Sequence, residues 1–259
     1  MEIKKCFTSG TCRLLHLFDE KFNYTNMQSI HYSNVGQYGG KNYLGFANTI
    51  EQHLFIMKII YNDIEIFEND LIELSYLFVM LSNNGDYRKT YMYVDTNYNF
   101  LTTLNTLKNE IKTTNIFIYE ISSIKEYKLR SSKNKFNFPI FMDSNDISNT
   151  TIFEKIDMTL EKMENDISDL ITYIKNKNNN AIIIFIGYMR NWMFDSTHPV
   201  IYERNMIANV LASVENVNNK IYYIDPTIYL TINDLKDTKH YNFNGKIKIL
   251  NVINNIISS

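Results

Sequence analysis

The sequence has few of the residues that interrupt secondary structure or cross-link a chain: 8 glycines, 3 prolines and 2 cysteines among 259 residues. Two cysteines, Cys6 and Cys12, do not make a disulfide framework, which favours a reducing compartment. No second pair of cysteines or histidines complements them, so they do not predict a metal site. Four histidines also lack the arrangement typical of metal ligands: His16, His31, His53 and His198. We therefore expect no metal and no cofactor.

Long apolar runs and strong charge are also missing. No stretch reaches the roughly 18 apolar residues of a membrane span, and residues 1–5 are not followed by the apolar segment of a secretory signal. Lys plus Arg total 26 and Asp plus Glu total 28, scattered along the chain with a net charge of −2. This balance excludes the electrostatic footprint of a nucleic-acid or anionic-membrane binder. We expect a cytoplasmic protein (in the host cell if the source is a virus).

Nucleotide-binding signatures are absent as well. Neither Gly-x-Gly-x-x-Gly nor Gly-x-x-x-x-Gly-Lys-Ser/Thr occurs, which argues against a dinucleotide or P-loop nucleotide function. The richness in Asn, Ile, Lys and Tyr indicates an AT-rich genome. Asn-rich loops such as 176–180 therefore carry little functional information.

The chain does show an alternation of strand and helix patterns. Strands are expected at 3–7, 29–32, 115–121, 181–187 and 221–224, and helices at 12–22, 50–61, 71–81, 101–111, 151–175, 198–214 and from 245 onward. Residues 87–97 suit a strand or an extended loop, and 125–149 a long loop that covers the site as a flap. No linker or repeat divides residues 1–259. The pattern predicts one three-layer α/β/α domain, flavodoxin-like, whose five parallel strands suit the order 2-1-3-4-5.

A base and its orienting acid are predicted near the C-terminal end. Asp237 precedes His240 by three residues, and Gly245 follows five residues later, before an apolar helix. A carboxylate at this spacing holds an imidazole in one tautomer, so that the histidine can act as a general base. Tyr241 is expected to pack beside them.

The nucleophile for this base is expected at the opposite end of the chain. Cys12 follows the first strand through Gly10 and starts a helix, whose N-terminus would lower a thiol pKa that is ordinarily about 8.5. A first strand-to-helix turn and a loop before the last helix converge at one edge of an α/β sheet. Thr11 or Ser9 is the alternative nucleophile if the turn is shifted by a residue or more, and Cys6 is expected in the core.

These two terminal blocks resemble the SGNH, or GDSL-like, hydrolase superfamily, which carries Gly-Asp-Ser after strand one and Asp-x-x-His before the last helix. Here Gly10-Thr11-Cys12 stands at the first block, with cysteine in place of serine. This variant is similar to the GSCFA family and to capsular-polysaccharide acetyltransferases, which carry Gly-Asn-Cys-Gln there. The resemblance implies a Cys12–His240–Asp237 triad in an acyl-ester hydrolase or O-acyltransferase.

The same resemblance implies an oxyanion hole made by a glycine after strand two and an asparagine after strand three. Gly36, Gly39 and Gly40 are the glycine candidates, together with Gly10 beside the nucleophile. After strand three the chain has no asparagine, so Ser122 is expected to donate instead. Asn48 is a further donor candidate, although its first expected role is to cap the helix from residue 50.

Two arginines are expected to bind substrate. Arg13 adjoins the nucleophile and could bind a carboxylate or polarise a carbonyl, and Arg190 follows the central strand at the carboxyl edge, where open sheets bind ligands. Apolar side chains of the segment around Arg190 are expected to form a wall for an acyl chain or sugar face, or to belong to the core under the 198–215 helix: Met189, Trp192, Met193 and Phe194.

Three functions remain open at this point. The first is a Cys–His–Asp enzyme acting on an acylated carbohydrate, with a small-molecule or carbohydrate ester as partner and an acyl donor if it is a transferase. The second is an inactive binding or scaffold protein with the same fold, favoured by the absent Gly-x-Asn block. The third is a Rossmann-like glycosyl- or nucleotide-sugar enzyme that shares only the parallel sheet.

Overall fold

A five-stranded parallel sheet forms the centre of the computed structural model, which describes residues 4–18, 27–31, 47, 49–67, 100–129, 139–140, 153–156, 158–190, 199–237 and 240–259. Its strands are β1 (Lys4–Ser9), β2 (Met27–His31), β3 (Ile116–Glu120), β7 (Ile182–Ile186) and β8 (Ile221–Ile224). Across the sheet they follow the order β2-β1-β3-β7-β8, and every neighbouring pair is parallel. In chain order this is 2-1-3-4-5, so the predicted topology is confirmed.

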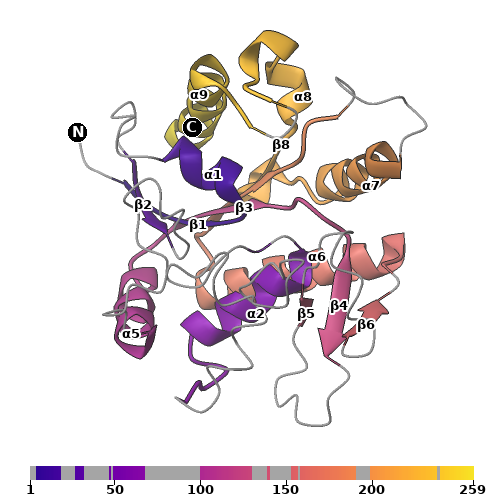
Figure 1. Ribbon diagram of the computed structural model, residues 1–259. Coiled ribbons are helices and arrows are strands. Elements are labelled where there is room, and N and C mark those ends of the chain that lie inside the picture. Colours follow the sequence, from indigo (N-terminus) through magenta and orange to yellow (C-terminus); the bar gives the residue numbers. More distant parts are fainter. Residues whose placement is uncertain are drawn as a thin grey trace.

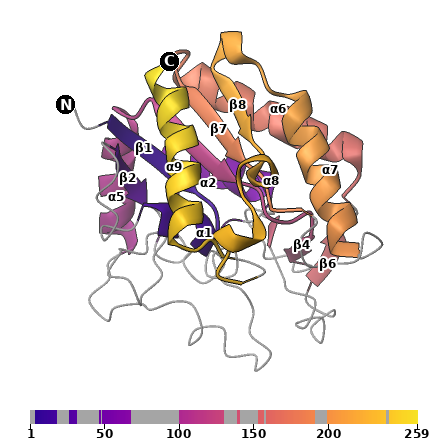
Figure 2. The same cartoon turned by 90° about the horizontal axis from the view of Figure 1, so that it is seen from above.

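Helices cover both faces of the sheet and make it the middle of three layers (Figure 1, Figure 2). One face carries α1 (Cys12–Leu17) and α9 (Phe243–Ser258), with the short α8 (Pro226–Tyr229) beside α9. The other face carries α2 (Ile50–Ile60), α5 (Phe100–Ile111) and α6 (Leu160–Lys177), and α7 (Pro199–Ser213) packs against α6. The three-layer α/β/α architecture is therefore as predicted.

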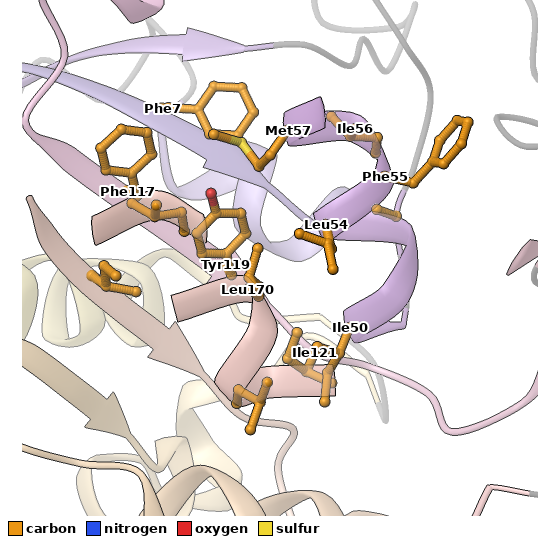
Figure 3. Close-up of a cluster of buried hydrophobic side chains, with 14 of the residues drawn as sticks. Phe7, Ile50, Leu54, Phe55, Ile56, Met57, Phe117, Tyr119, Ile121 and Leu170 are labelled. Carbon is orange, nitrogen blue, oxygen red and sulfur yellow. The ribbon is translucent and has the colours of Figure 1, made fainter. Parts of the chain in front are cut away.

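Strands β1, β3, β7 and β8 each contribute to an apolar core on either face of the sheet, because successive side chains point to opposite faces. Phe7, Phe117 and Tyr119 pack against α2 and α6, as Figure 3 shows. Their neighbours Cys6 and Ile118 instead pack against α1 and α9 on the opposite face. This division explains why the central strands read as continuous apolar runs, as expected of a parallel sheet covered on both sides.

A small antiparallel sheet is formed by segments that come between β3 and α6 in the chain, so residues 126–129 and 139–140 of the predicted loop at 125–149 are strands. Its strands are β4 (Glu126–Leu129), β5 (Pro139–Ile140) and β6 (Phe153–Ile156), in the order β5-β4-β6. Because residues 153–156 pair with β4, the helix predicted from 151 begins only at Leu160, where the Thr159 side chain accepts from the Lys162 N–H. The predicted elements at 71–81 and 87–97 lie outside the described residues.

The cap of α2 is Thr49, so the prediction that Asn48 caps this helix is wrong. The Thr49 side chain accepts from the Gln52 backbone N–H, and the Gln52 side chain accepts from the Thr49 N–H in return. This reciprocal capping box satisfies two backbone donors at the helix start. Asn48 itself lies outside the described residues.

Two other boundaries differ from the prediction. Strand β1 continues through Thr8 to Ser9, and α1 ends at Leu17 rather than near residue 22. The predicted turn between strand and helix thus shrinks to Gly10 and Thr11. Within the described part of the chain, no helix combines the length and the apolar character that crossing a membrane requires.

Candidate active site

The carboxyl end of the sheet gathers polar side chains from five segments of the chain. Parallel strands β1, β3, β7 and β8 all end at this edge, as their paired registers require. Thr11 follows β1, Glu120 closes β3, Tyr188 follows β7 and Asp225 follows β8. The loop before α9 adds His240. Ligands in open α/β sheets bind at this edge, so the side chains gathered here form the candidate site.

Glu120 ties β3 to the turn between β1 and α1. Its Oε2 accepts the Thr11 backbone N–H at 2.8 Å and also the Thr11 hydroxyl, while its Oε1 accepts Arg13 Nε and Nη2, each at 2.5 Å. Glu120 is 1% exposed and Arg13 is 3% exposed, so the ion pair is buried. Several donors converge on this carboxylate, as a buried charge requires.

Arg13 also stacks on an aromatic ring that a second arginine shares. The Arg13 Cζ lies 3.4 Å from the Tyr188 ring centroid, and the Arg204 Cζ lies 3.8 Å from it. Arg204 Nη1 donates to the Met189 carbonyl at 2.7 Å, which anchors α7 to the segment after β7. Guanidinium groups at such distances gain cation–π attraction. Arg13 is thus a buried anchor of the turn, which corrects the expectation that it meets substrate.

The predicted Asp237–His240 pair forms. The His240 Nδ1 lies 2.9 Å from both carboxylate oxygens of Asp237, and the His240 backbone N–H donates to Asp237 Oδ1 at 2.9 Å. The two side chains are 35% and 48% exposed, so the pair is open to solvent. With Nδ1–H donating to the carboxylate, the neutral ring carries its lone pair on Nε2, which is the tautomer that a general base needs.

Tyr241 links this pair to the turn after β1. It is buried in the apolar cluster that includes Leu14 of α1 and Ile249 of α9. Burial raises the pKa of Tyr241; the Arg13 charge acts against this shift, and the Glu120 carboxylate adds to it. The described residues of α1 and α9 pack against each other, and the two helices lie side by side in both views (Figure 1, Figure 2). Cys12 begins α1, and His240 lies three residues before α9, so both belong to segments that lead into these two neighbouring helices.

Cys12 is the first residue of α1, and for it the structure describes the backbone. The two alternative nucleophiles both lie in hydrogen-bond networks. Thr11 donates its hydroxyl to Glu120, and Ser9, the last residue of β1, is completely buried and hydrogen-bonded to His53 Nδ1. A substrate cannot reach a serine without exposed surface, so Ser9 does not suit the role.

His53 forms a serine–histidine contact that the sequence did not indicate. Its Nε2 donates to the Glu120 carbonyl at 3.1 Å, which leaves Nδ1 to accept from Ser9. The ring also makes an edge contact with Tyr119, with centroids 5.2 Å apart. Burial lowers the pKa of His53 to about 3. Since both groups are fully buried, the pair joins α2 to β1 and β3 rather than forming a reactive site.

The remaining predicted residues are divided between the site and its surroundings. Gly10 is buried, and a Cβ there would lie 2.6 Å from Glu120 Cβ, so the close approach of β3 requires glycine. Arg190 forms an ion pair with Asp225, which follows the carboxyl end of β8. The Arg190 backbone N–H donates to the Thr227 hydroxyl at 3.1 Å. Ser122 is half-buried, two residues beyond β3.

The other predicted residues belong to the core or lie outside the described part of the chain. Met189 is buried with the α9 cluster, which supports the core alternative for that residue. The rest of the predicted apolar wall and two oxyanion candidates lie outside the described residues: Trp192, Met193, Phe194, Gly36 and Asn48. The glycines at 39 and 40 lie outside them as well.

Sequence reasoning missed Glu120, Tyr188 and Asp225. The signal for Glu120 was a charged residue at the end of an apolar strand, with the same parity as Ile116 and Ile118, which face α1. No three histidine, cysteine, aspartate or glutamate side chains of the described residues cluster as metal ligands would. Comparison of the sequence with models of known protein families gives no match, and neither does a search of curated proteins.

Proposed function

We propose that the protein is an acyl-group enzyme, a carboxylic-ester hydrolase or an O-acyltransferase, in which Cys12 is the nucleophile, His240 the base and Asp237 the group that orients His240. An acylated carbohydrate is the substrate class, because the cysteine in the first block resembles polysaccharide-modifying relatives of the SGNH superfamily. The one observation that carries the proposal is the Asp237–His240 hydrogen bond, formed in the loop that enters the helix packed against α1.

The proposed reaction uses two acyl transfers. The Cys12 thiol gives its proton to His240 Nε2 and its sulfur attacks the ester carbonyl, which forms a tetrahedral oxyanion. Collapse of this intermediate breaks the ester C–O bond, leaves a Cys12 thioester, and returns the proton from His240 to the departing alkoxide. Water in a hydrolase, or a sugar hydroxyl in a transferase, then gives its proton to His240 and attacks the thioester, which forms a second tetrahedral oxyanion. Collapse of this intermediate breaks the C–S bond and releases the acid or the new ester, and His240 returns its proton to the Cys12 sulfur.

Asp237 contributes to this cycle through the tautomer and the charge of His240. Its carboxylate holds Nδ1–H, so Nε2 is the basic atom, and it stabilises the imidazolium formed when the thiol proton moves. Both roles require only the 2.9 Å contact between His240 Nδ1 and the Asp237 carboxylate, which is present in the structure. Replacement of Asp237 by Asn is therefore expected to lower kcat by about 10²- to 10⁴-fold, with a smaller change in KM.

The test measures release of p-nitrophenol from p-nitrophenyl acetate and release of acetate from acetylated oligosaccharides. Cys12→Ala and His240→Ala are each expected to abolish both activities, while the other cysteine provides the matched control, Cys6→Ala. Cys6 lies within β1 in the core, so the control keeps turnover if it folds, which circular dichroism checks. Turnover that survives in both Cys12→Ala and His240→Ala would overturn the mechanism.

One observation favours a second candidate, an inactive binding protein of the same fold. Glu120 ends β3 close to the position where the resemblance implies an asparagine, and a carboxylate accepts hydrogen bonds but donates none. Loss of an oxyanion donor costs about 10²- to 10³-fold in rate unless another group replaces it. Iodoacetamide separates the two: a Cys12 that stays unlabelled in the folded protein, together with absent turnover, favours the binding protein.

A further inference from the structure

The turn between β1 and α1 is held on both sides of Cys12 by one side chain from another strand. Glu120 Oε2 accepts from Thr11, the residue before Cys12, and Oε1 accepts from Arg13, the residue after it. Thr11 contributes both its backbone N–H and its hydroxyl. A carboxylate has room for about four such donors, so these contacts use its capacity.

Burial makes these contacts of Glu120 with Thr11 and Arg13, here called the Glu120 clamp, rigid. Glu120 is 1% exposed, Arg13 is 3% exposed, and Gly10 leaves no room for a Cβ between its backbone and Glu120. The contacts span 107 and 109 residues of sequence and join β3 to α1 directly. Removing one partner of a buried charged pair leaves the other charge uncompensated, so breaking the contact between Glu120 and Arg13 costs free energy and the turn is held in this arrangement.

We propose that Glu120 is a positioning residue for the nucleophile: it fixes the backbone on either side of Cys12 and neutralises the charge of Arg13, the residue that follows Cys12. This inference deepens the proposed function and rests on Cys12 being its nucleophile. Glu120 acts through Thr11 and Arg13 and needs no contact with substrate. Its carboxylate therefore sets two properties of Cys12, the geometry of attack and the local charge.

These two properties respond to Glu120→Gln in opposite ways. The variant leaves the Arg13 guanidinium without its counter-charge, and a nearby positive charge favours a thiolate, so the pKa of Cys12 is expected to fall by about one unit. Glutamine also turns an NH₂ group toward donors, which loosens the turn. Misplaced reacting groups lose rate, so kcat is expected to fall about 10- to 100-fold with KM nearly unchanged.

The experiment measures the rate of iodoacetamide alkylation of Cys12 against pH, by peptide mass spectrometry, beside kcat and KM for p-nitrophenyl acetate. Glu120→Asp is the conservative variant: it keeps the charge, so its alkylation midpoint stays near that of the parent, and its kcat exceeds that of Glu120→Gln. Asp166→Asn is the matched control, because it removes one carboxylate of an ion pair, with Lys162, on α6 at the opposite face of the sheet. Its alkylation midpoint is expected to equal the parent's.

Each outcome decides one question. A lower midpoint together with a lower kcat in Glu120→Gln supports the clamp, since simple destabilisation would not shift the midpoint. A midpoint and a kcat equal to the parent's overturn it, even if Cys12→Ala abolishes turnover and so upholds the proposed function. A shifted alkylation midpoint in Glu120→Gln, when the parent protein cleaves no ester, overturns the proposed function but not the clamp. A Cys12 that resists alkylation at every pH overturns both the clamp and the proposed function.

Discussion

Histidine 53 makes the stability of this protein sensitive to acid in a way that can be calculated. The ring is fully buried between Ser9 and the Glu120 carbonyl, and burial lowers its pKa from 6.5 to about 3. Between these two values the unfolded chain binds a proton at this residue and the folded chain does not. The free energy of unfolding therefore falls by about 1.4 kcal/mol for each pH unit below 6.5 because of His53 alone.

The variant His53→Gln isolates this contribution. Glutamine does not titrate, so all other acid-sensitive groups cancel when the two proteins are compared at the same pH. At pH 7 the variant is expected to be about 2 kcal/mol less stable, because Ser9 and the Glu120 carbonyl lose well-placed partners. From pH 6.5 to pH 5 the difference should shrink by about 2 kcal/mol, since only the parent loses the His53 contribution.

Urea unfolding at pH 7, 6 and 5, monitored by far-ultraviolet circular dichroism, measures these free energies of unfolding. The prediction concerns the difference between parent and variant, which removes errors common to both extrapolations. If the two free energies fall in parallel between pH 6.5 and 5, His53 is protonated in the folded protein, and the buried neutral contact with Ser9 is wrong.

Two further predictions test packing and a buried acid. Gly10→Ala adds a Cβ 2.6 Å from Glu120 Cβ and 3.0 Å from Leu14 Cδ2, so overpacking should cost about 1–3 kcal/mol and lower Tm in calorimetry; an unchanged Tm would contradict the close approach. Glu126→Gln tests an acid whose pKa is raised to about 9 by burial and by neighbouring Glu51. Between pH 4.5 and 9 the Glu126 carboxyl is protonated in the folded parent and ionised in the unfolded chain. The free energy of unfolding of the parent should therefore fall by about 1.4 kcal/mol per pH unit as the pH rises toward 9, and that of the variant should not. Parallel urea curves from pH 6 to 8 would contradict that assignment.

The sequence predicted the sheet well because each central strand is an apolar run between two helical patterns. Residues 182–186 and 221–224 are strands whose identity depends mainly on local composition, and their order follows from parallel, right-handed connections. The Asp237–His240 contact was predictable for a related reason. Its partners are three residues apart, so the local chain almost fixes their distance.

Contacts between distant segments were not predictable in this way. His53 lies on the apolar face of α2, and nothing local indicates that its partner is Ser9, which is 44 residues away. Glu120 meets Thr11 and Arg13 only because β3 lies beside β1 in the sheet. A single sequence does not specify which distant donor fills a buried carboxylate.

The misplaced boundaries have local causes of a different kind. Asn48 and Thr49 both suit a helix cap, and both have a Glu or Gln three residues later, so only the geometry selects Thr49. Strands β4 and β5 have four and two residues, too few for a visible alternation. The segment therefore resembled a loop, although its pairing with β6 makes it part of a sheet.

The central claim is that the thiol of Cys12 accepts an acyl group with His240 as its base. The protein is mixed with p-nitrophenyl acetate and the reaction is stopped rapidly with acid. Mass spectrometry of the intact chain and its peptides then measures this directly. The account predicts one acetyl group, on the peptide that contains Cys12, in the parent protein, and a much slower appearance in His240→Ala. An acetyl group on another residue, or equal rates in the parent and His240→Ala, would contradict it.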